Sequence, residues 1–463
     1  MGGDGGDDRE FEPPPGGDRM KLPGADWQRR EGMAPLMRAL GAAEGETRYV
    51  GGCVRDTLLG LEVSDVDLAT RLEPDDVLRR LKRAHIKAVP TGIAHGTVTA
   101  VPRGGPVEVT TLRRDVSTDG RRATIAYTDD WREDAARRDF TINALSADPE
   151  TLKVHDYFGG EEDLLERRVR FIGAPLVRIA EDHLRILRFF RFHARFGQGE
   201  PDAAALEACA IRANDLMALS RERIADELLK LLALPDPHTT LELMVERGIL
   251  RPVLPEIGPG GVERLNVLIA YEKALNIDRD ALRRLAALLP PDAEVVDSVS
   301  GRLRLSNAAR KRLNRAAMPL DESDTARQLL GRSSLHPYEV LDLILLSDLG
   351  RERVLVEVKS LQGWEKPVFP LQGRDLLALG LTPGAASGAS GLAKWKPWPL
   401  VQPSSVSATA SSSVSMPSAV VLRPSASASE STARTIATES LSFSMPVTKL
   451  RSILSTSIGS RCR

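Results

Sequence analysis

The spacing of apolar residues divides the chain into a mixed N-terminal region and a long region with helical spacing only. Up to about residue 113, runs of β-branched residues predict strands over 46–52, 64–70, 88–102 and 105–113. Helical spacing predicts helices over 27–41, 54–61 and 74–84, the last of which begins at a proline followed by two acids. The polar stretch 115–134 predicts a loop.

After about residue 160 the β-branched runs stop, and apolar residues three and four apart predict helices only. The predicted fold class is therefore α+β, an α/β head followed by a long all-helical part. The predicted helices cover 176–196, 220–234, 238–250, 261–276, 279–289, 307–318, 324–334, 336–364 and 373–380.

The two ends of the chain differ in composition from the rest. Residues 1–27 are mostly Gly, Asp and Pro and are expected to be a disordered arm. Residues 401–463 hold 19 serines and only two acids, and helical spacing is lost near residue 384. A natural low-complexity tail and a shifted reading frame both explain this, and the abruptness of the change favours the second. No fold or function is assigned to residues 384–463.

The charge balance limits how the chain can bind nucleic acid. It has 63 Lys and Arg against 64 Asp and Glu, a net charge of -1, so any nucleic-acid surface must be a local patch. No apolar run is long enough to cross a bilayer, and the first residues do not have the pattern of a secretory signal. Three cysteines are too few for a disulfide framework or a four-thiolate zinc site. A cytoplasmic, reduced protein without a membrane partner is expected.

A glycine pair followed by two aspartates is the first pattern with chemical meaning. Gly51 and Gly52 follow a predicted strand and, lacking a Cβ, let the backbone approach a phosphate. Arg55 on the next turn could bind triphosphate oxygens. Asp65 and Asp67 stand two apart in a predicted strand, so their carboxylates face one side and could hold Mg²⁺ together with substrate phosphates. The same residues also fit a plain turn with surface acids.

Glu108 is the candidate for a third carboxylate. It lies in a predicted strand between Val107 and Val109, whose side chains face the opposite side of the strand. On pattern alone, an ordinary solvent-facing strand residue explains Glu108 as well.

Two arginine-rich segments follow. The first, from Arg137 to Asn143, combines Arg138 and Asp139 with an amide, which suits contacts to phosphate or ribose at a helix entry. The alternative is a helix start with solvated arginines.

The second segment lies on the predicted helix 176–196. Asp182, Arg185 and Arg188 are three apart and share a helix stripe, which Arg191 continues. Residues 166–196 hold eight arginines and no lysine, and arginine is the side chain suited to bidentate recognition of phosphates and base edges. Asp–Arg pairs within the helix, worth about 0.2–0.5 kcal/mol each, are the alternative but do not explain so many arginines.

Together these segments resemble one family. The strings GGCVRDTLLGLEVSDVDLAT, EVTTLRRD, RRDFTINAL, DYFGG, EDHLRILRFFRFHARF and SRERIADELLKLL have the order and spacing of the class II tRNA nucleotidyltransferases, the CCA-adding enzymes, and of the related bacterial poly(A) polymerases. The resemblance covers about residues 28–383. It implies a nucleotidyltransferase head (28–160), a helical neck that recognises the nucleobase (161–235) and a helical body that binds tRNA (236–383). The family's further helical tail is replaced here by the Ser-rich segment (384–463).

The resemblance also implies residue roles in the head. Asp65 and Asp67 would hold the catalytic Mg²⁺, and Glu108 falls where related enzymes place a third acid. Contacts with the incoming triphosphate and its sugar are implied for Gly52, Arg55 and Arg138, supported by Asp139 and Asn143.

In the neck, the resemblance implies that Asp182 and Arg185 recognise the nucleobase. Arg188 and Arg191 would complete the pocket and bind phosphate, and Arg223 and Glu227 would support this helix. An Asp acceptor beside an Arg donor matches the edges of cytosine and adenine but not of uracil or guanine. Polar groups left unpaired cost about 1–3 kcal/mol each, which is enough to reject the wrong bases.

The expected function is template-independent addition of CMP and AMP, from CTP and ATP, to the 3′ end of tRNA with release of pyrophosphate. A poly(A) polymerase that adds AMP to RNA 3′ ends is the nearest alternative, and an enzyme that adds only CC or only A is another. A catalytically inactive helical RNA-binding protein is the third alternative, against which the presence of both Asp65 and Asp67 argues. The sequence leaves the oligomeric state open.

Overall fold

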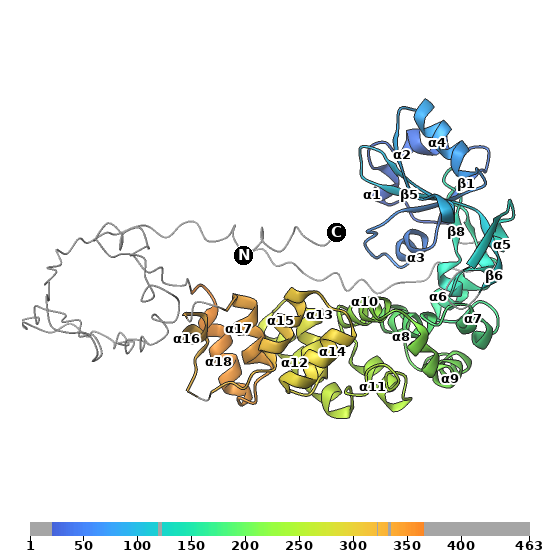
Figure 1. Cartoon of the computed structure of the whole chain (residues 1–463). Helices are drawn as coiled ribbons and strands as arrows, with labels where there is room; N and C mark the ends of the chain where they lie inside the picture. Colours follow the sequence, from blue (N-terminus) through green and yellow to red (C-terminus); the bar gives the residue numbers. More distant parts are fainter. Residues whose placement is uncertain (1–20, 119–122, 322, 332–334, 365–463) are drawn as a thin grey trace, which may run out of the picture. The chain divides into compact units, whose positions relative to one another are not determined.

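Seven strands from the first third of the chain form one mixed sheet (Figure 1). In the computed structural model, which describes residues 21–364 except 119–122, 322 and 332–334, β2 and β5 are parallel and the other neighbours are antiparallel. The described residues belong to one unit, Met1–Phe369. The order across the sheet is β3 (Lys87–Gly92), β4 (Thr97–Val101), β5 (Val107–Thr111), β2 (Asp67–Thr70), β1 (Thr47–Val50), β8 (Ser146–Ala147) and β9 (Val154–His155).

The two faces of this sheet have different surroundings. Leu68 of β2 pairs with Val109 of β5, and both are buried in the main apolar core together with residues of α2 (Met33–Ala39) and α4 (Pro74–Arg83). Because side chains alternate along a strand, Asp67 and its partner Glu108 face the other side. On that side a small separate cluster, which includes Ala69 of β2, covers the sheet. We call this side of the sheet, onto which Asp67 and Glu108 point, the carboxylate face.

The predicted helix over 27–41 is two helices, α1 (Asp26–Arg29) and α2. Gly32 separates them with φ +88°, a left-handed conformation that residues with a Cβ rarely adopt, and a Cβ there would lie 2.8 Å from the Cβ of Pro102. The turn thus depends on close approach of two backbone segments, which apolar spacing does not reveal.

The loop predicted over 115–134 is wrong. This stretch contributes to a hairpin of β6 (Arg113–Thr118) and β7 (Ala123–Tyr127), followed by α5 (Trp131–Ala136). The strands pair antiparallel from Arg113 and Tyr127 inward, so their backbone groups find partners in each other. Asp130 caps α5 by accepting the N–H of Arg132 at 2.8 Å. The polar composition of this stretch gave no sign of the strand pairing, which supplies hydrogen-bond partners for the backbone N–H and C=O groups.

Helices make up the rest of the described chain, in green, yellow and orange in Figure 1. One apolar cluster extends from Leu22 in the head to Val358 in the last described helix. No helix among the described residues is long and apolar enough to cross a membrane. The helices used below are α3 (Gly52–Leu58), α7 (Pro175–Glu181), α8 (Arg185–Phe196), α9 (Ala203–Ile211), α10 (Arg221–Leu232), α12 (Pro259–Leu275), α13 (Ala281–Leu288), α15 (Asn307–Ala316), α17 (Pro337–Leu345) and α18 (Arg351–Leu361).

Two long predicted helices are also broken. The helix predicted over 176–196 stops at Glu181 and resumes at Arg185, because the Asp182 carboxylate accepts the N–H of Leu184 at 3.1 Å and so competes with the helical bond. The helix predicted over 336–364 is α17 and α18, with Gly350 as the N-cap of the second. Residues 1–20 of the predicted arm, the helix over 373–380 and the Ser-rich segment lie outside the described residues. For residues 21–27 the predicted disorder is wrong, because Leu22 is buried in the main apolar core and its N–H donates to the Leu152 carbonyl at 2.8 Å.

A buried ion network fixes the end of α10. The Arg284 guanidinium, almost wholly buried, pairs with Glu272 of α12 at 2.8 Å and donates to the Leu232 carbonyl at 2.7 Å. The neighbouring Arg283 joins Glu272 to Asp342 of α17. The last carbonyls of α10 therefore have a charged donor, and this helix carries two residues of the site described next.

Candidate active site

Two carboxylates lie side by side on the carboxylate face. Asp67 opens β2 and is the register partner of Glu108 in the parallel strand β5. The Glu108 N–H donates to the Val66 carbonyl at 3.2 Å, which keeps the strands in this register. Neighbouring strands lie about 4.8 Å apart, so the two side chains leave the sheet next to each other. Asp65, two residues before Asp67, is exposed at the entry to β2.

The electrostatics of this cluster favour a cation. Burial raises the pKa of Asp67, and the nearby carboxylates of Glu108 and Asp65 raise it further, while the Arg138 guanidinium lowers it. Adjacent carboxylate oxygens are the ligands that Mg²⁺ prefers, and it commonly takes one or two carboxylates plus substrate phosphates. Asp65 and Asp67 fit that requirement. Across the part of the chain that the structure describes, no group of three or more His, Cys, Asp or Glu is placed to hold a metal ion.

The glycine turn brings Arg138 to this cluster. Gly51 has φ +69° and precedes α3, which begins at Gly52. A Cβ on Gly51 would lie only 2.9 Å from Nη1 of Arg138, so the missing side chain makes room for the guanidinium. The Asp134 carboxylate of α5 forms ion pairs with Arg138 at 3.3 Å and with Arg137 at 2.8 Å. Sequence reasoning missed Asp134, although its spacing of three and four residues from these arginines was a usable signal.

Arg55 is buried below the glycine turn. Its guanidinium lies 4.1 Å from the ring centroid of Phe196 in α8, pairs with Asp56 and donates to the side-chain oxygen of Asn143. The Asn143 amide in turn donates to Asp139 at 2.9 Å. A chain of buried polar side chains therefore packs against the glycine turn. It runs from Arg55 through Asn143 to Asp139.

Asp139 joins this chain to the neck. The Arg188 Nε donates to the Asp139 carboxylate at 2.7 Å. Burial by itself would raise the pKa of Asp139, but Arg188 and the hydrogen bonds from Asn143 and the Phe140 N–H outweigh it and hold the pKa below its usual value. The carboxylate is therefore charged at neutral pH, and it is a fixed partner for Arg188.

The residues predicted to recognise the nucleobase do not share a helix stripe, because Asp182 lies in the break between α7 and α8. Its carboxylate accepts two bonds from Nη2 of Arg223 in α10, at 3.1 and 2.9 Å, and remains partly exposed. Arg185, the first residue of α8, donates to Glu181 at 2.5 Å and to the Arg137 carbonyl at 3.2 Å. The two side chains are thus held by different partners.

The arginines of this segment are neutralised. Seven of the eight pair with carboxylates, and most partners come from other elements, so the segment is not an open basic patch. The Glu227 carboxylate of α10 accepts a bond from Arg191 of α8 at 2.6 Å. It also lies 3.8 Å from Arg188 of the same helix. The pairs are Arg168 and Arg170 with Asp163, Arg178 and Arg185 with Glu181, Arg188 with Asp139, Arg191 with Glu227, and Arg195 with Asp56.

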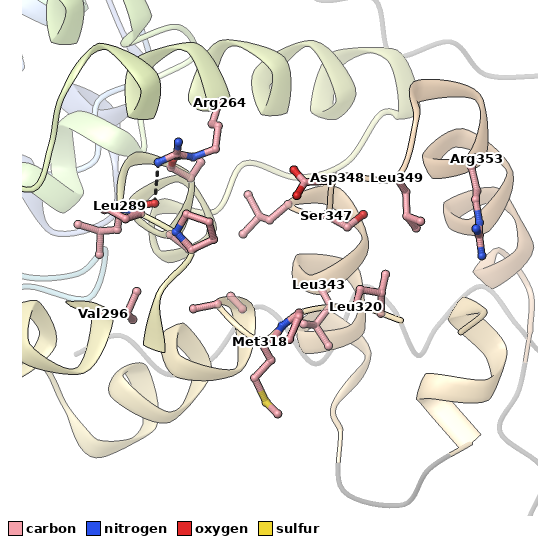
Figure 2. Close-up of a pocket in the computed structure, with 18 of the residues that line it drawn as sticks. Arg264, Leu289, Val296, Met318, Leu320, Leu343, Ser347, Asp348, Leu349 and Arg353 are labelled. Atoms are coloured by element: carbon pink, nitrogen blue, oxygen red, sulfur yellow. Dashed lines mark hydrogen bonds between the residues drawn. The ribbon is translucent and has the colours of Figure 1, made fainter. Parts of the chain in front are cut away.

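A cavity of about 620 Å³ lies elsewhere, in the helical body (Figure 2). Apolar residues such as Met318 and Leu343 line most of it, together with Arg264 and Asp348. Arg264 is held by the Leu289 carbonyl at 2.8 Å. None of the site residues described above lines this cavity.

The head and the helices that follow it define a class of protein. Residues 47–170 match the family described as "Poly A polymerase head domain", and residues 200–259 match "Probable RNA and SrmB- binding site of polymerase A". The chain therefore carries the head domain of this polymerase class.

Individual relatives narrow the family. The "CCA tRNA nucleotidyltransferase 1, mitochondrial" of Danio rerio is 36% identical over 374 residues, covering 77% of this chain and 84% of the relative. The "CCA-adding enzyme" of Limosilactobacillus fermentum is 33% identical, covering 76% and 88%. The crystal structure of the Bacillus stearothermophilus CCA-adding enzyme in complex with CTP superposes with a TM-score of 0.57 at 28% identity, over 76% of this chain and 89% of that one. The chain belongs to the CCA tRNA nucleotidyltransferase family.

The resemblance predicted from the motifs is thereby confirmed. The predicted fold class is also confirmed, because a mixed-sheet head precedes a helical part here and in the matching structures. The comparisons do not assign roles to individual residues, so the roles given to Asp65, Glu108, Asp182 and the arginines stay predictions.

Proposed function

We propose that this chain adds CMP and AMP from CTP and ATP to the 3′ end of tRNA, without a nucleic-acid template. The observation that carries the proposal is the pairing of Asp67 with Glu108 on one face of the sheet, next to Arg138 and the glycine turn. This is a cluster of anionic oxygens beside a cation that can bind phosphate. The relatives named for CCA addition support the choice of substrates.

The reaction is in-line attack of the RNA 3′-hydroxyl oxygen on the α-phosphorus of the nucleotide. A new P–O bond forms, the bond to pyrophosphate breaks, and the hydroxyl proton passes to the Glu108 carboxylate or to water. Asp65 and Asp67 would hold Mg²⁺, which when bound lowers the pKa of a hydroxyl and neutralises the leaving pyrophosphate. Arg138 donates to triphosphate oxygens beside the Gly51 turn, and Glu108 is placed next to Asp67 to accept the proton or to orient the hydroxyl.

Base selection in this proposal depends on Asp182. Its carboxylate is oriented by Arg223 and remains partly exposed, so it can accept a hydrogen bond from the amino group of cytosine or adenine. Uracil and guanine present an oxygen at that position, and two acceptors facing each other leave a polar group unpaired.

Changing Asp182 to Asn should relax this selection. The amide can donate as well as accept, so the preference for CTP over UTP, measured as the ratio of kcat/KM values, should fall about 5- to 150-fold, which corresponds to the 1–3 kcal/mol of an unpaired group. Asp226 of α10, exposed and paired with Lys230, gives the matched control D226N, which should keep the wild-type ratio. An unchanged CTP preference in D182N would remove Asp182 from base selection.

One assay tests the whole proposal. The tRNA transcripts lack CCA, end in CC or are complete, and labelled CTP or ATP is supplied with Mg²⁺. CCA addition extends the first by three nucleotides and the second by one, and leaves the third unchanged. Long adenylate tails would indicate a poly(A) polymerase, and products that stop after CC, or form only from CC ends, would indicate a partial activity.

The cytoplasmic location expected from the sequence stays a prediction, and the Danio rerio relative is named as mitochondrial.

A further inference from the structure

Three arginines of the head lie against aromatic rings instead of carboxylates. The Arg48 guanidinium lies 4.2 Å and that of Arg71 5.7 Å from the centroid of the Trp131 ring, and that of Arg132 lies 5.5 Å from the Phe158 ring. None of the three forms an ion pair with a carboxylate in the described ranges, unlike the arginines of α8. Their charge is therefore available to a ligand.

Arg48 and Arg71 share the carboxylate face with the predicted catalytic residues. Arg48 of β1 is the register partner of Ala69, which stands two residues after Asp67 in β2. Arg71 follows two residues later, and its N–H donates to the Glu46 carbonyl, which extends the same pairing. Two residues span about 7 Å along a strand, so Arg48 lies opposite a position about 7 Å from Asp67, and Arg71 lies about 13 Å from Asp67 on the same face.

Each of the two guanidiniums uses one N–H group in a hydrogen bond that fixes its position, and its other N–H groups are left for a ligand. Nη1 of Arg48 donates to the hydroxyl of Tyr157 at 3.1 Å, and Nε of Arg71 donates to the Asp129 carbonyl at 2.9 Å. Arg48 is half-buried and Arg71 is exposed. A guanidinium stacked on a ring keeps its plane fixed and presents its remaining N–H groups at the edge, the geometry suited to phosphate oxygens.

Acids in the adjacent segment are engaged with other groups. The Asp130 carboxylate caps α5, and that of Glu133 accepts the Thr128 hydroxyl at 2.6 Å. Asp134 is paired with the two arginines at the end of α5. These carboxylates therefore do not neutralise Arg48 or Arg71.

We propose that Arg48 and Arg71, stacked on Trp131, bind a backbone phosphate of the RNA strand whose 3′-hydroxyl reacts beside Asp67. This inference rests on the proposed function. The triphosphate of the nucleotide offers the same chemistry, but Arg138 and the glycine turn already lie next to the carboxylates. A phosphate-binding pair on β1 and after β2 is placed for a neighbouring nucleotide of the RNA.

The test compares R71Q and R48Q with the wild type and with R38Q, which removes an exposed arginine of α2 packed on the opposite face. The dissociation constant for tRNA lacking CCA is measured between 50 and 200 mM salt, together with the KM for CTP. Each of R71Q and R48Q should bind tRNA on the order of tenfold more weakly. The slope of log K against log salt should fall by about 0.7–0.9, the value for one phosphate contact, while the KM for CTP stays within about twofold.

Thermal melting controls for damage to the fold, and R48K keeps the charge and should retain the wild-type salt slope. An unchanged salt slope in R71Q and R48Q, or a raised KM for CTP with tRNA binding intact, would overturn the RNA assignment. R38Q behaving like R71Q would do the same, because the effect would then be general charge. Since binding is read without catalysis, failure of the wild type to incorporate nucleotides would refute the proposed function separately.

Discussion

Replacing Asp65 and Asp67 together with alanine should reduce nucleotide incorporation by about 10³-fold or more while tRNA still binds. The two carboxylates are the proposed metal ligands, and loss of a single preorganised charge-stabilising group at an active site already costs on the order of 10²–10³-fold. Incorporation of labelled CTP into tRNA lacking CCA measures the loss, and a filter-binding assay measures tRNA affinity.

The matched control removes Asp75 and Asp76, two neighbouring acids in the first turn of α4, and should keep activity within about twofold. Adding a chelator to the wild type should reproduce the loss, and Mg²⁺ should restore activity. Activity that survives in the double variant would exclude these aspartates as metal ligands. A wild type that binds tRNA but incorporates nothing, with or without Mg²⁺, would support the inactive RNA-binding alternative.

Changing Asp139 to alanine should lower the free energy of unfolding by about 2–3 kcal/mol. The substitution leaves the Arg188 guanidinium with only Glu227, at 3.8 Å, and the Asn143 amide without its acceptor, and a buried polar group left unpaired costs about 1–3 kcal/mol. Urea unfolding followed by circular dichroism measures the change. The control D236A breaks an exposed pair with Lys273 and should cost no more than about 1 kcal/mol. Equal losses in the two variants would show that the Asp139 pair is not special.

The same residue predicts a pH dependence. Because the folded protein holds the pKa of Asp139 below its usual value, its stabilising effect is fully present above the unfolded pKa of about 3.9 and is lost as the pH falls through the lower folded value. The variant D139N keeps the shape but has no titrating group. The difference in unfolding free energy between wild type and D139N should therefore shrink as the pH is lowered from 7 toward 3. A difference that stays constant or grows would contradict the lowered pKa.

Short-range patterns predicted much of the head. The strand containing Asp67 and the strand containing Glu108 were both predicted, and alternation correctly placed Val107 and Val109 away from Glu108. Helix α4 begins at Pro74, as a proline followed by acids indicated. In each case the determining interactions lie within a few residues along the chain, so the sequence carries them directly.

Failures occurred where partners are distant in sequence. The stripe of Asp182 and Arg185 was predicted from helical spacing, but Asp182 bonds to Arg223, 41 residues away, and to a nearby N–H that ends the helix. The arginine excess of residues 166–196 indicated recognition of phosphates and base edges, whereas Arg188 and Arg191 are paired with carboxylates on other elements. Composition counts charges but does not pair them.

The sequence by itself determined the family, the order of head and helices, and which carboxylates and arginines are the candidates for chemistry, because motif spacing and apolar periodicity are local properties. Only the tertiary structure decided which of these charged side chains form ion pairs with each other and which have no charged partner within the described part of the protein. Ion pairs and hydrogen bonds between elements form when the chain folds, and desolvation then makes each unpaired charge expensive. Arg188, prominent in the motif, is therefore paired with Asp139, whereas Arg48, outside every motif, lies against the Trp131 ring and has no carboxylate partner among the described residues.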